Sequence, residues 1–145
     1  MTGQGTMRFL WSDAWLLQAI ALASRKEPAT LADLLAAADA VNHALPTSEE
    51  LHGALSRLGV GGFVEKVDDR FRLTSRVPAE IRNAMSEGGW LRGRDAASAL
   101  LEAEAWSPRT NVGDPRNDVT YPGLTPERIR RAEREYRRRA RRSTG

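Results

Sequence analysis

The sequence of 145 residues contains no cysteine, which excludes disulfide bonds, thiolate zinc sites and cysteine nucleophiles. It contains only two histidines, His43 and His52, and no serine stands in the pattern of a nucleophile elbow. The glycine cluster at residues 59–62 lacks the spacing of a phosphate-binding loop. These absences argue against an enzyme, and we expect no catalytic residue, no metal site and no cofactor.

Long apolar runs are also missing from the sequence. No run reaches the 18 residues or so that a membrane-spanning helix needs, and residues 14–23 have the length of a buried core helix. Residues 1–7 lack the basic and apolar regions of a signal peptide. Together with the absence of cysteine, this pattern predicts a cytoplasmic protein that does not enter a membrane.

Lysine is scarce, because only Lys26 and Lys66 are lysines among the 22 basic residues. Arginine suits phosphate recognition, although a codon bias towards alanine and arginine explains the same composition. The hydrophobic fraction of 41% suffices for a single core, and the length favours one compact domain with an appendage over two domains.

Two capped amphipathic helices are predicted at residues 30–40 and 47–58, separated by Pro46, which forces the preceding residue out of the helical conformation. Each helix opens with a threonine cap and an acidic residue three positions later, as in a capping box: Thr30 with Asp33, and Thr47 with Glu50. Apolar residues at helical spacing predict one shared core that also holds Trp15 or Leu17. Its members on the two helices are Leu31, Leu34, Leu35, Ala38, Val41, Leu51, Ala54, Leu55 and Leu58.

A β-hairpin is predicted directly after these helices. Residues 63–67 and 70–73 are rich in Val and Phe, and Asp68-Asp69 between them can form the turn because Asp tolerates a positive φ. The residues expected to face the core are Phe63, Val67, Phe71 and Leu73, and those expected to face outward are Glu65, Arg70 and Arg72.

With an apolar helix at residues 13–24 in front, the order of elements is that of a winged helix-turn-helix domain. The stretch LHGALSRLGVGGFVEKVDDRFRLT resembles the recognition helix and wing of bacterial winged helix-turn-helix transcriptional regulators. The residues at the matching packing, turn and wing positions are Leu55, Leu58, Gly62, Phe63, Val64, Phe71, Leu73 and Thr74. The resemblance covers residues 13–74 and implies a mainly α fold with a small β-hairpin, and DNA binding through a helix and the hairpin. The segment AAADAVNHALPT is longer than the usual turn of that family.

Positive charge is concentrated at the end of the chain. Residues 125–145 contain nine arginines and three acidic residues, a net charge of +6, whereas residues 1–124 have a net charge of −3. Such a segment binds nucleic-acid phosphates by counterion release, or an acidic protein. The alternative is a solvated tail whose arginines suit a helix C-terminus.

The residues expected to contact DNA come from three segments. They are Ser48, His52, Ser56 and Arg57 on the predicted recognition helix, Lys66, Arg70, Arg72 and Arg76 on the wing, and Arg130, Arg131, Arg134, Arg137, Arg138 and Arg141 on the C-terminal helix. However, residues 1–76 have a net charge of −1, and Glu49 and Glu50 open the recognition helix, where phosphates would lie. The leading hypothesis is therefore a small DNA-binding transcriptional regulator, and the alternative is a winged helix that binds another protein.

The chain divides into four predicted parts. These are a winged helix-turn-helix domain at 1–76, accessory helices at 77–106, a loop containing proline and glycine at 107–124, and an arginine-rich helix or tail at 125–145. The accessory helices are expected at 78–86 and 95–106. We also predict a homodimer through residues 79–106, around the apolar side chains of Trp90, Leu91, Leu100, Leu101 and Trp106.

Overall fold

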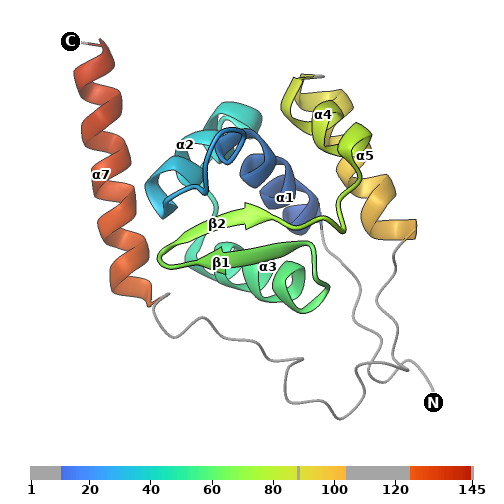
Figure 1. The fold of residues 1–145 in the computed structure, drawn as a ribbon. Coiled ribbons are helices and arrows are strands. Elements are labelled where there is room, and N and C mark those ends of the chain that lie inside the picture. The colour runs from blue at the N-terminus through green and yellow to red at the C-terminus, as the bar shows by residue number, and fades with distance from the viewer. Residues whose placement is uncertain (1–10, 88, 104–124, 145) are drawn as a thin grey trace.

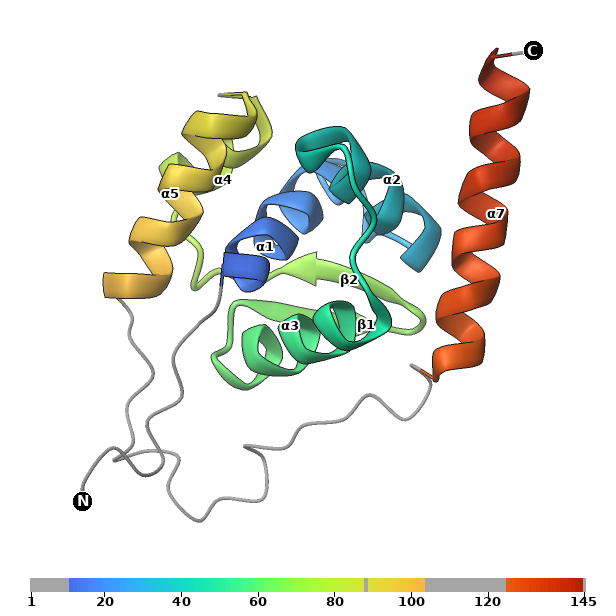
Figure 2. The same cartoon turned by 180° about the vertical axis from the view of Figure 1, so that it is seen from behind.

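The computed structural model describes residues 11–87, 89–103 and 125–144. Within these residues, six helices and one two-stranded antiparallel hairpin form a mainly α fold, as the sequence predicts. The elements are α1 (Trp11–Ala23), α2 (Leu31–Asn42), α3 (Ser48–Val60), β1 (Val64–Val67), β2 (Arg70–Leu73), α4 (Ala79–Glu87), α5 (Trp90–Ala103) and α7 (Pro126–Thr144). Helix α1 lies in the centre, α4 and α5 lie on one side of it, and α7 stands beside α2 on the other side (Figure 1 and, from behind, Figure 2).

Helix α1 is the centre of the core, and every side chain from Ser12 to Ala21 is buried. The predicted shared core is confirmed, because Leu17 and the five core leucines of α2 and α3 are completely inaccessible to solvent: Leu34, Leu35, Leu51, Leu55 and Leu58. Trp15 is also buried, and its indole Nε1 donates a hydrogen bond of 3.0 Å to the carbonyl oxygen of Ala38. This bond joins α1 to α2 inside the core.

Both predicted capping boxes are present. The hydroxyl of Thr30 accepts a hydrogen bond from the Asp33 N–H, and that of Thr47 accepts one from the Glu50 N–H, each at 3.1 Å, with the carboxylates bonding back to the threonine N–H groups. His43 closes α2 in the left-handed conformation, with φ 55°, which is the usual way to end a helix. The order of α1, α2, α3 and the hairpin is therefore compatible with a winged-helix shape.

The hairpin pairs β1 with β2 from Val64 opposite Leu73 to Val67 opposite Arg70. The turn is the predicted one, and Asp68 has a positive φ of 56°. The inward side of the hairpin is nearly as predicted: Phe63, Phe71 and Leu73 are buried, but Val64 is buried where Val67 was expected, and Val67 is half-buried. Ala29 adds a pairing that the sequence analysis missed, because it exchanges two backbone hydrogen bonds of 2.8 Å with Phe71.

The accessory helices are partly as predicted. Helix α4 agrees with the expected 78–86, but the expected start of the next helix at residue 95 is wrong, since α5 begins at Trp90. Gly93 lies where α5 comes closest to α1 and α4. A Cβ there would lie 2.2 Å from Gln18 Nε2 and 3.1 Å from Met85 Cα, so only glycine lets α5 approach α1 and α4 this closely.

The predicted apolar dimer surface is not present in the form expected. Leu100 and Leu101 are only 8% and 3% exposed because they pack into the core of their own chain. Leu91 is 54% exposed, whereas Trp106 and the loop at 107–124 lie outside the described residues. Among the helices that the structure describes, none has both the length and the apolarity to cross a membrane.

Candidate nucleic-acid interface

Helix α7 packs against α2 along one narrow apolar stripe. Ile129 is 1% exposed and Ala132 is 9% exposed, and α2 is the helix that lies against them. The helix starts as the sequence predicts, with Pro126 in the first turn and the hydroxyl of Thr125 accepting a hydrogen bond of 3.2 Å from the Arg128 N–H. The first half of α7 is therefore docked on the fold and is not a solvated tail.

Three polar contacts flank this apolar stripe. The hydroxyl of Tyr136 donates a hydrogen bond to the carboxylate of Asp39 on α2. Arg139 Nη1 lies 2.9 Å from Asp33 Oδ1 at the start of α2, and Arg128 Nη1 lies 3.5 Å from Asp69 Oδ1 at the tip of the hairpin. These contacts lie along the length of α7, so they fix which side of the helix faces the body of the protein.

The contacts of α7 shift the acid–base equilibria of two residues. The hydrogen bond to Asp39, together with burial and the negative charge of Asp39, raises the pKa of the Tyr136 hydroxyl above its ordinary value. Burial by itself raises the pKa of the Asp33 carboxyl, but the hydrogen bonds from Arg139 and Thr30 outweigh burial, and the pKa of Asp33 lies below its ordinary value. Both shifts mean that the docked helix stabilises a neutral tyrosine and an ionised aspartate.

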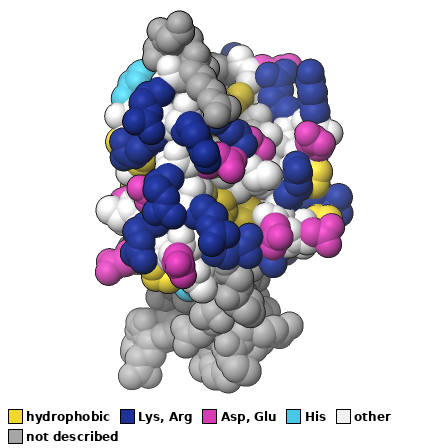
Figure 3. All heavy atoms as spheres, turned by 90° about the vertical axis from the view of Figure 1, so that its left-hand side faces the viewer, with side chains coloured by type: hydrophobic (Ala, Val, Ile, Leu, Met, Phe, Trp, Pro, Cys, Tyr) yellow, Lys and Arg dark blue, Asp and Glu magenta, His cyan; other side chains and the backbone are white. Residues whose placement is uncertain are grey.

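The opposite side of α7 carries six exposed arginines, all of which the sequence analysis selected. They are Arg130, Arg131, Arg134, Arg137, Arg138 and Arg141, and we call them the arginine face. With 3.6 residues per turn, they fall within an arc of roughly 120° and extend over about 17 Å of the helix axis. Figure 3 views the molecule from this side, where Lys and Arg side chains cover much of the surface and Asp and Glu side chains lie between them.

Most of the positive charge on the arginine face is not neutralised by the protein itself. Within the part of the chain that the structure describes, its first five members make no hydrogen bond or ion pair through their side chains. By contrast, Arg128 and Arg139 on the inner side are paired with carboxylates. The helix therefore separates paired arginines, which hold it in place, from unpaired arginines, which face solvent.

Helix α3 is organised in the opposite way, as its one arginine shows. Arg57 Nε lies 2.7 Å from Asp13 Oδ2 and Arg57 Nη2 lies 2.8 Å from Asp13 Oδ1, a two-pronged contact with a carboxylate that is fully buried on α1. Gly53 makes room for it, since a Cβ there would lie only 3.0 Å from Arg57 Nη2. The contact gives Arg57 a structural role, because its guanidinium is committed to Asp13 and not to a ligand.

The other selected side chains of α3 offer little to a ligand. The hydroxyl oxygen of Ser56 is buried and has no hydrogen-bond partner among the described residues. Ser48 and His52 are half-buried, and Glu50 is engaged in the capping box, while Glu49 is exposed beside it. The surface of α3 therefore supplies few donors for base edges and places negative charge at its first turn.

The four basic side chains selected on the wing are all exposed, but several have neighbours. Arg72 Nε lies 2.7 Å from Glu65 Oε1, and Arg70 Nη1 donates a hydrogen bond of 3.2 Å to the Pro28 carbonyl oxygen. The guanidinium of Arg76 lies 5.2 Å from the centre of the Phe63 ring. Lys66 is the fourth basic side chain of the wing. Because Arg128 contacts the hairpin turn, the wing and the start of the arginine face lie next to each other.

The residues that dock α7 carry no signal of this role in the sequence. Asp33 was assigned to a cap and Asp69 to a turn, and nothing in the local pattern indicates that a distant helix contacts these two carboxylates and that of Asp39. Groups of three or more His, Asp or Glu side chains that could hold a metal ion do not occur within residues 11–87, 89–103 and 125–144. No family model matches the chain, and no curated protein or solved structure is significantly similar to it.

Proposed function

We propose that the protein binds nucleic acid, with duplex DNA as the expected partner, and that the arginine face of α7 and the neighbouring wing contact its phosphates. The observation that carries this proposal is the row of exposed arginines on a helix whose other side is anchored to the fold. Five of them, Arg130, Arg131, Arg134, Arg137 and Arg138, have no carboxylate partner among the described residues. The resemblance of residues 13–74 to winged helix-turn-helix transcriptional regulators, with which the order of elements is compatible, supports the same partner.

A docked helix suits phosphate binding for two physical reasons. Arginine presents a planar set of donors that matches a phosphate group, and an anchored helix spends less conformational entropy on binding than a mobile tail. Each phosphate contact also releases counterions, which makes the affinity strongly dependent on salt. We therefore expect binding that weakens steeply as salt concentration rises.

The state of α3 suggests that contacts to the DNA backbone outweigh contacts to bases. Arg57 is paired with Asp13, and the hydroxyl of Ser56 is buried, so the position at which a winged helix usually reads bases has few side chains to do so. Phosphate contacts position a protein on the duplex but carry no sequence information directly. The proposed binding accordingly depends little on sequence, and a role in transcription would rest on the wing, on His52 or on pairing of two copies.

The test is fluorescence anisotropy of a labelled duplex over a range of salt concentrations. Replacing Arg134 and Arg137 by Gln should weaken binding and lower the log–log salt slope by up to about 1.8, because each phosphate contact contributes about 0.9. The control replaces Lys26 and Arg92 by Gln, which removes the same charge from exposed positions outside α7 and the wing. Equal slopes for the two double variants would show that net charge, and not the arginine face, drives binding.

A second candidate function is binding of another protein, because the two glutamates that open α3, of which Glu49 is exposed, would repel phosphates at the position where a winged helix usually contacts DNA. The arginine face would then hold an acidic segment of that protein. A strongly acidic peptide, such as a short polyglutamate, serves as the competing ligand in the same anisotropy assay. If the intact protein does not bind duplex DNA even at low salt but binds the peptide through Arg134 and Arg137, the protein-binding function replaces DNA binding.

The proposed homodimer has a smaller contact surface than residues 79–106 suggested. A regulator gains affinity by placing two copies on adjacent half-sites, but Leu100 and Leu101 are buried in their own chain. Among the described side chains, the large apolar ones that stay exposed near α5 are Leu91 and, at the start of α1, Trp11, which is 49% exposed. Light scattering of the wild type and Leu91→Ala at micromolar concentration checks this proposal, and a monomeric wild type would remove dimerisation from it.

A further inference from the structure

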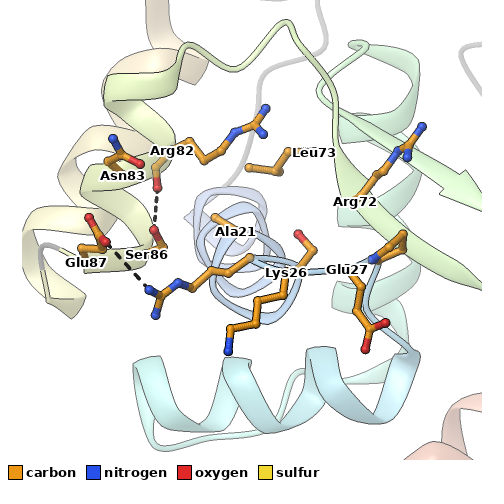
Figure 4. A pocket seen from close by; sticks show the side chains of 12 residues that line it. Ala21, Lys26, Glu27, Arg72, Leu73, Arg82, Asn83, Ser86 and Glu87 are labelled. Atoms are coloured by element: carbon orange, nitrogen blue, oxygen red, sulfur yellow. Dashed lines mark hydrogen bonds and ion pairs between the residues drawn. The ribbon is translucent and has the colours of Figure 1, made fainter.

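A cavity of about 290 Å³ lies between the end of α1, strand β2 and helix α4. We call it the α1–α4 cavity. Its floor is apolar, since Ala21 and Leu73 are 2% and 8% exposed. Its rim is charged, and the charged side chains around it are Arg25, Lys26, Glu27, Arg72, Arg82 and Glu87 (Figure 4).

The charges on this rim are unequal, with four cations and two carboxylates. Arg25 Nη2 lies 3.8 Å from Glu87 Oε1, and Arg72 is paired with Glu65 outside the cavity. Arg82 has a different partner, because its Nη2 donates a hydrogen bond of 3.0 Å to the backbone carbonyl of Thr74. A carbonyl holds the guanidinium in place without neutralising it, so Arg82 keeps its charge and most of its donors.

Lys26 contributes a second cation without a carboxylate partner among the described residues. It reaches the cavity from the segment after α1, whereas Arg82 reaches it from α4 on the far side (Figure 4). A ligand lying on the apolar floor between them would meet positive charge from two directions. Two cations on opposite sides of a small space suit a ligand with two negative charges.

We propose that the α1–α4 cavity binds a small dianion, in which one anionic oxygen contacts Arg82 and a second anionic oxygen contacts Lys26. The volume is at the lower end of the range for small-molecule sites, so the ligand is of the size of a dicarboxylic acid or a small phosphate compound. This site is separate from the arginine face of α7, and it does not depend on the proposed binding of nucleic acid.

Two features of the cavity oppose an anion, and both are weaker than the attraction. Glu27 and Glu87 lie on the rim, but Glu87 faces Arg25, which leaves one carboxylate against two cations. The C-terminal end of α1 brings partial negative charge, but the carbonyl of Ile20 in its last turn already accepts hydrogen bonds from the N–H and the hydroxyl of Ser24. A ligand with one negative charge would therefore bind more weakly in this cavity than a ligand with two.

Calorimetric titration of the intact protein in a low-salt buffer tests the proposal, with inorganic phosphate, succinate and acetate as probes. Succinate and phosphate should bind with one site per chain and acetate should bind at least about tenfold more weakly, because it carries only one charge to pair. Arg82→Gln and Lys26→Gln should each weaken binding of the dianions by about tenfold, the usual effect of losing one charge-assisted hydrogen bond. A preference for phosphate or succinate would identify which acid group the cavity takes.

Two controls keep this experiment decisive. Arg92→Gln removes one charge from α5 outside the cavity, and Arg134→Gln with Arg137→Gln removes two from α7, and neither change should alter the binding of succinate. Lys26 is an exposed side chain, so Lys26→Gln should leave the fold intact even if Arg82→Gln does not. The proposal is wrong if the intact protein shows no saturable binding of a dianion, or if the α7 variant loses binding and Lys26→Gln keeps it.

Discussion

Helices α3 and α7 both lie on the surface, and both carry residues that the sequence marks as contacts to nucleic acid, yet they use these residues in opposite ways. On α3 the selected arginine turns inward to a buried carboxylate, and a selected serine has its hydroxyl oxygen buried. On α7 the six selected arginines are all exposed. The helix at the expected recognition position therefore supports the core, and the appended helix presents the charge.

The difference follows from what lies behind each helix. Helix α3 packs directly on α1, where Asp13 is buried and needs a cation, because an isolated charge in a protein interior is costly. Helix α7 packs at the edge of the fold, against α2, and its narrow apolar stripe buries Ile129 and Ala132. A position in a fold thus indicates where a ligand could bind, but the partners of each side chain decide whether that side chain is available.

The largest expected effect comes from replacing an arginine on each of the two helices. Arg57→Ala leaves the carboxylate of Asp13 buried without its main partner, so we expect a loss of about 3–5 kcal/mol in the free energy of unfolding. Arg134→Ala removes the same side chain from the exposed side of α7 and should change stability by less than about 0.5 kcal/mol. Urea unfolding followed by circular dichroism measures both, and similar losses would mean that the two arginines do not differ in role.

The next effect concerns the apolar side of α3. Leu55 is inaccessible to solvent, so Leu55→Ala should lower the free energy of unfolding by roughly 2–5 kcal/mol, the range for a buried leucine. His52→Ala, at a half-buried position one turn away on the same helix, should cost much less. A thermal melt of Leu55→Ala that matches the wild type would contradict the packing of α3 on α1.

Local features of the fold could be predicted from the sequence. The capping boxes at Thr30 and Thr47 and the leucine stripes are local patterns, because a helix sets both by its own geometry, and the structure has them where they were expected. The exposure of the arginine face is also a matter of helix periodicity, since Ile129, Ala132 and Tyr136 lie on the opposite side of α7.

The features that could not be predicted depend on contacts between distant residues. Arg57 was selected for DNA because nothing in its neighbourhood shows that Asp13, 44 positions earlier, lies beside it in the fold. The role of Gly93 in the close packing of α5 against Gln18 depends on where α1 lies, which the local sequence does not show. The pairing of Ala29 with Phe71 also joins residues that are far apart in the sequence. Because only a single residue takes part on the side of Ala29, there is no strand pattern that would predict it.

The docking of α7 can be tested separately from its charge. Ile129 is 1% exposed, so Ile129→Ala should lower the free energy of unfolding by about 2 kcal/mol, at the low end for a buried isoleucine because the interface is narrow. Trypsin should also cut α7 faster, since cleavage at its arginines requires local unfolding. The exposed Glu127→Ala on the same helix serves as the control, and unchanged cleavage of Ile129→Ala would mean that the stripe does not hold α7 in place.

The smallest effect concerns the hydrogen bond between Tyr136 and Asp39. Tyr136→Phe removes it and should cost about 1 kcal/mol at neutral pH. The bond raises the pKa of Tyr136 in the folded protein, so its contribution is complete below the unfolded value of about 10 and is lost as pH rises through the higher folded value. Arginine stays charged over this range. Urea midpoints of the two proteins should therefore differ at pH values near neutrality and converge in strong alkali, and a difference that stays constant with pH would show that the hydroxyl of Tyr136 does not stabilise the docked helix.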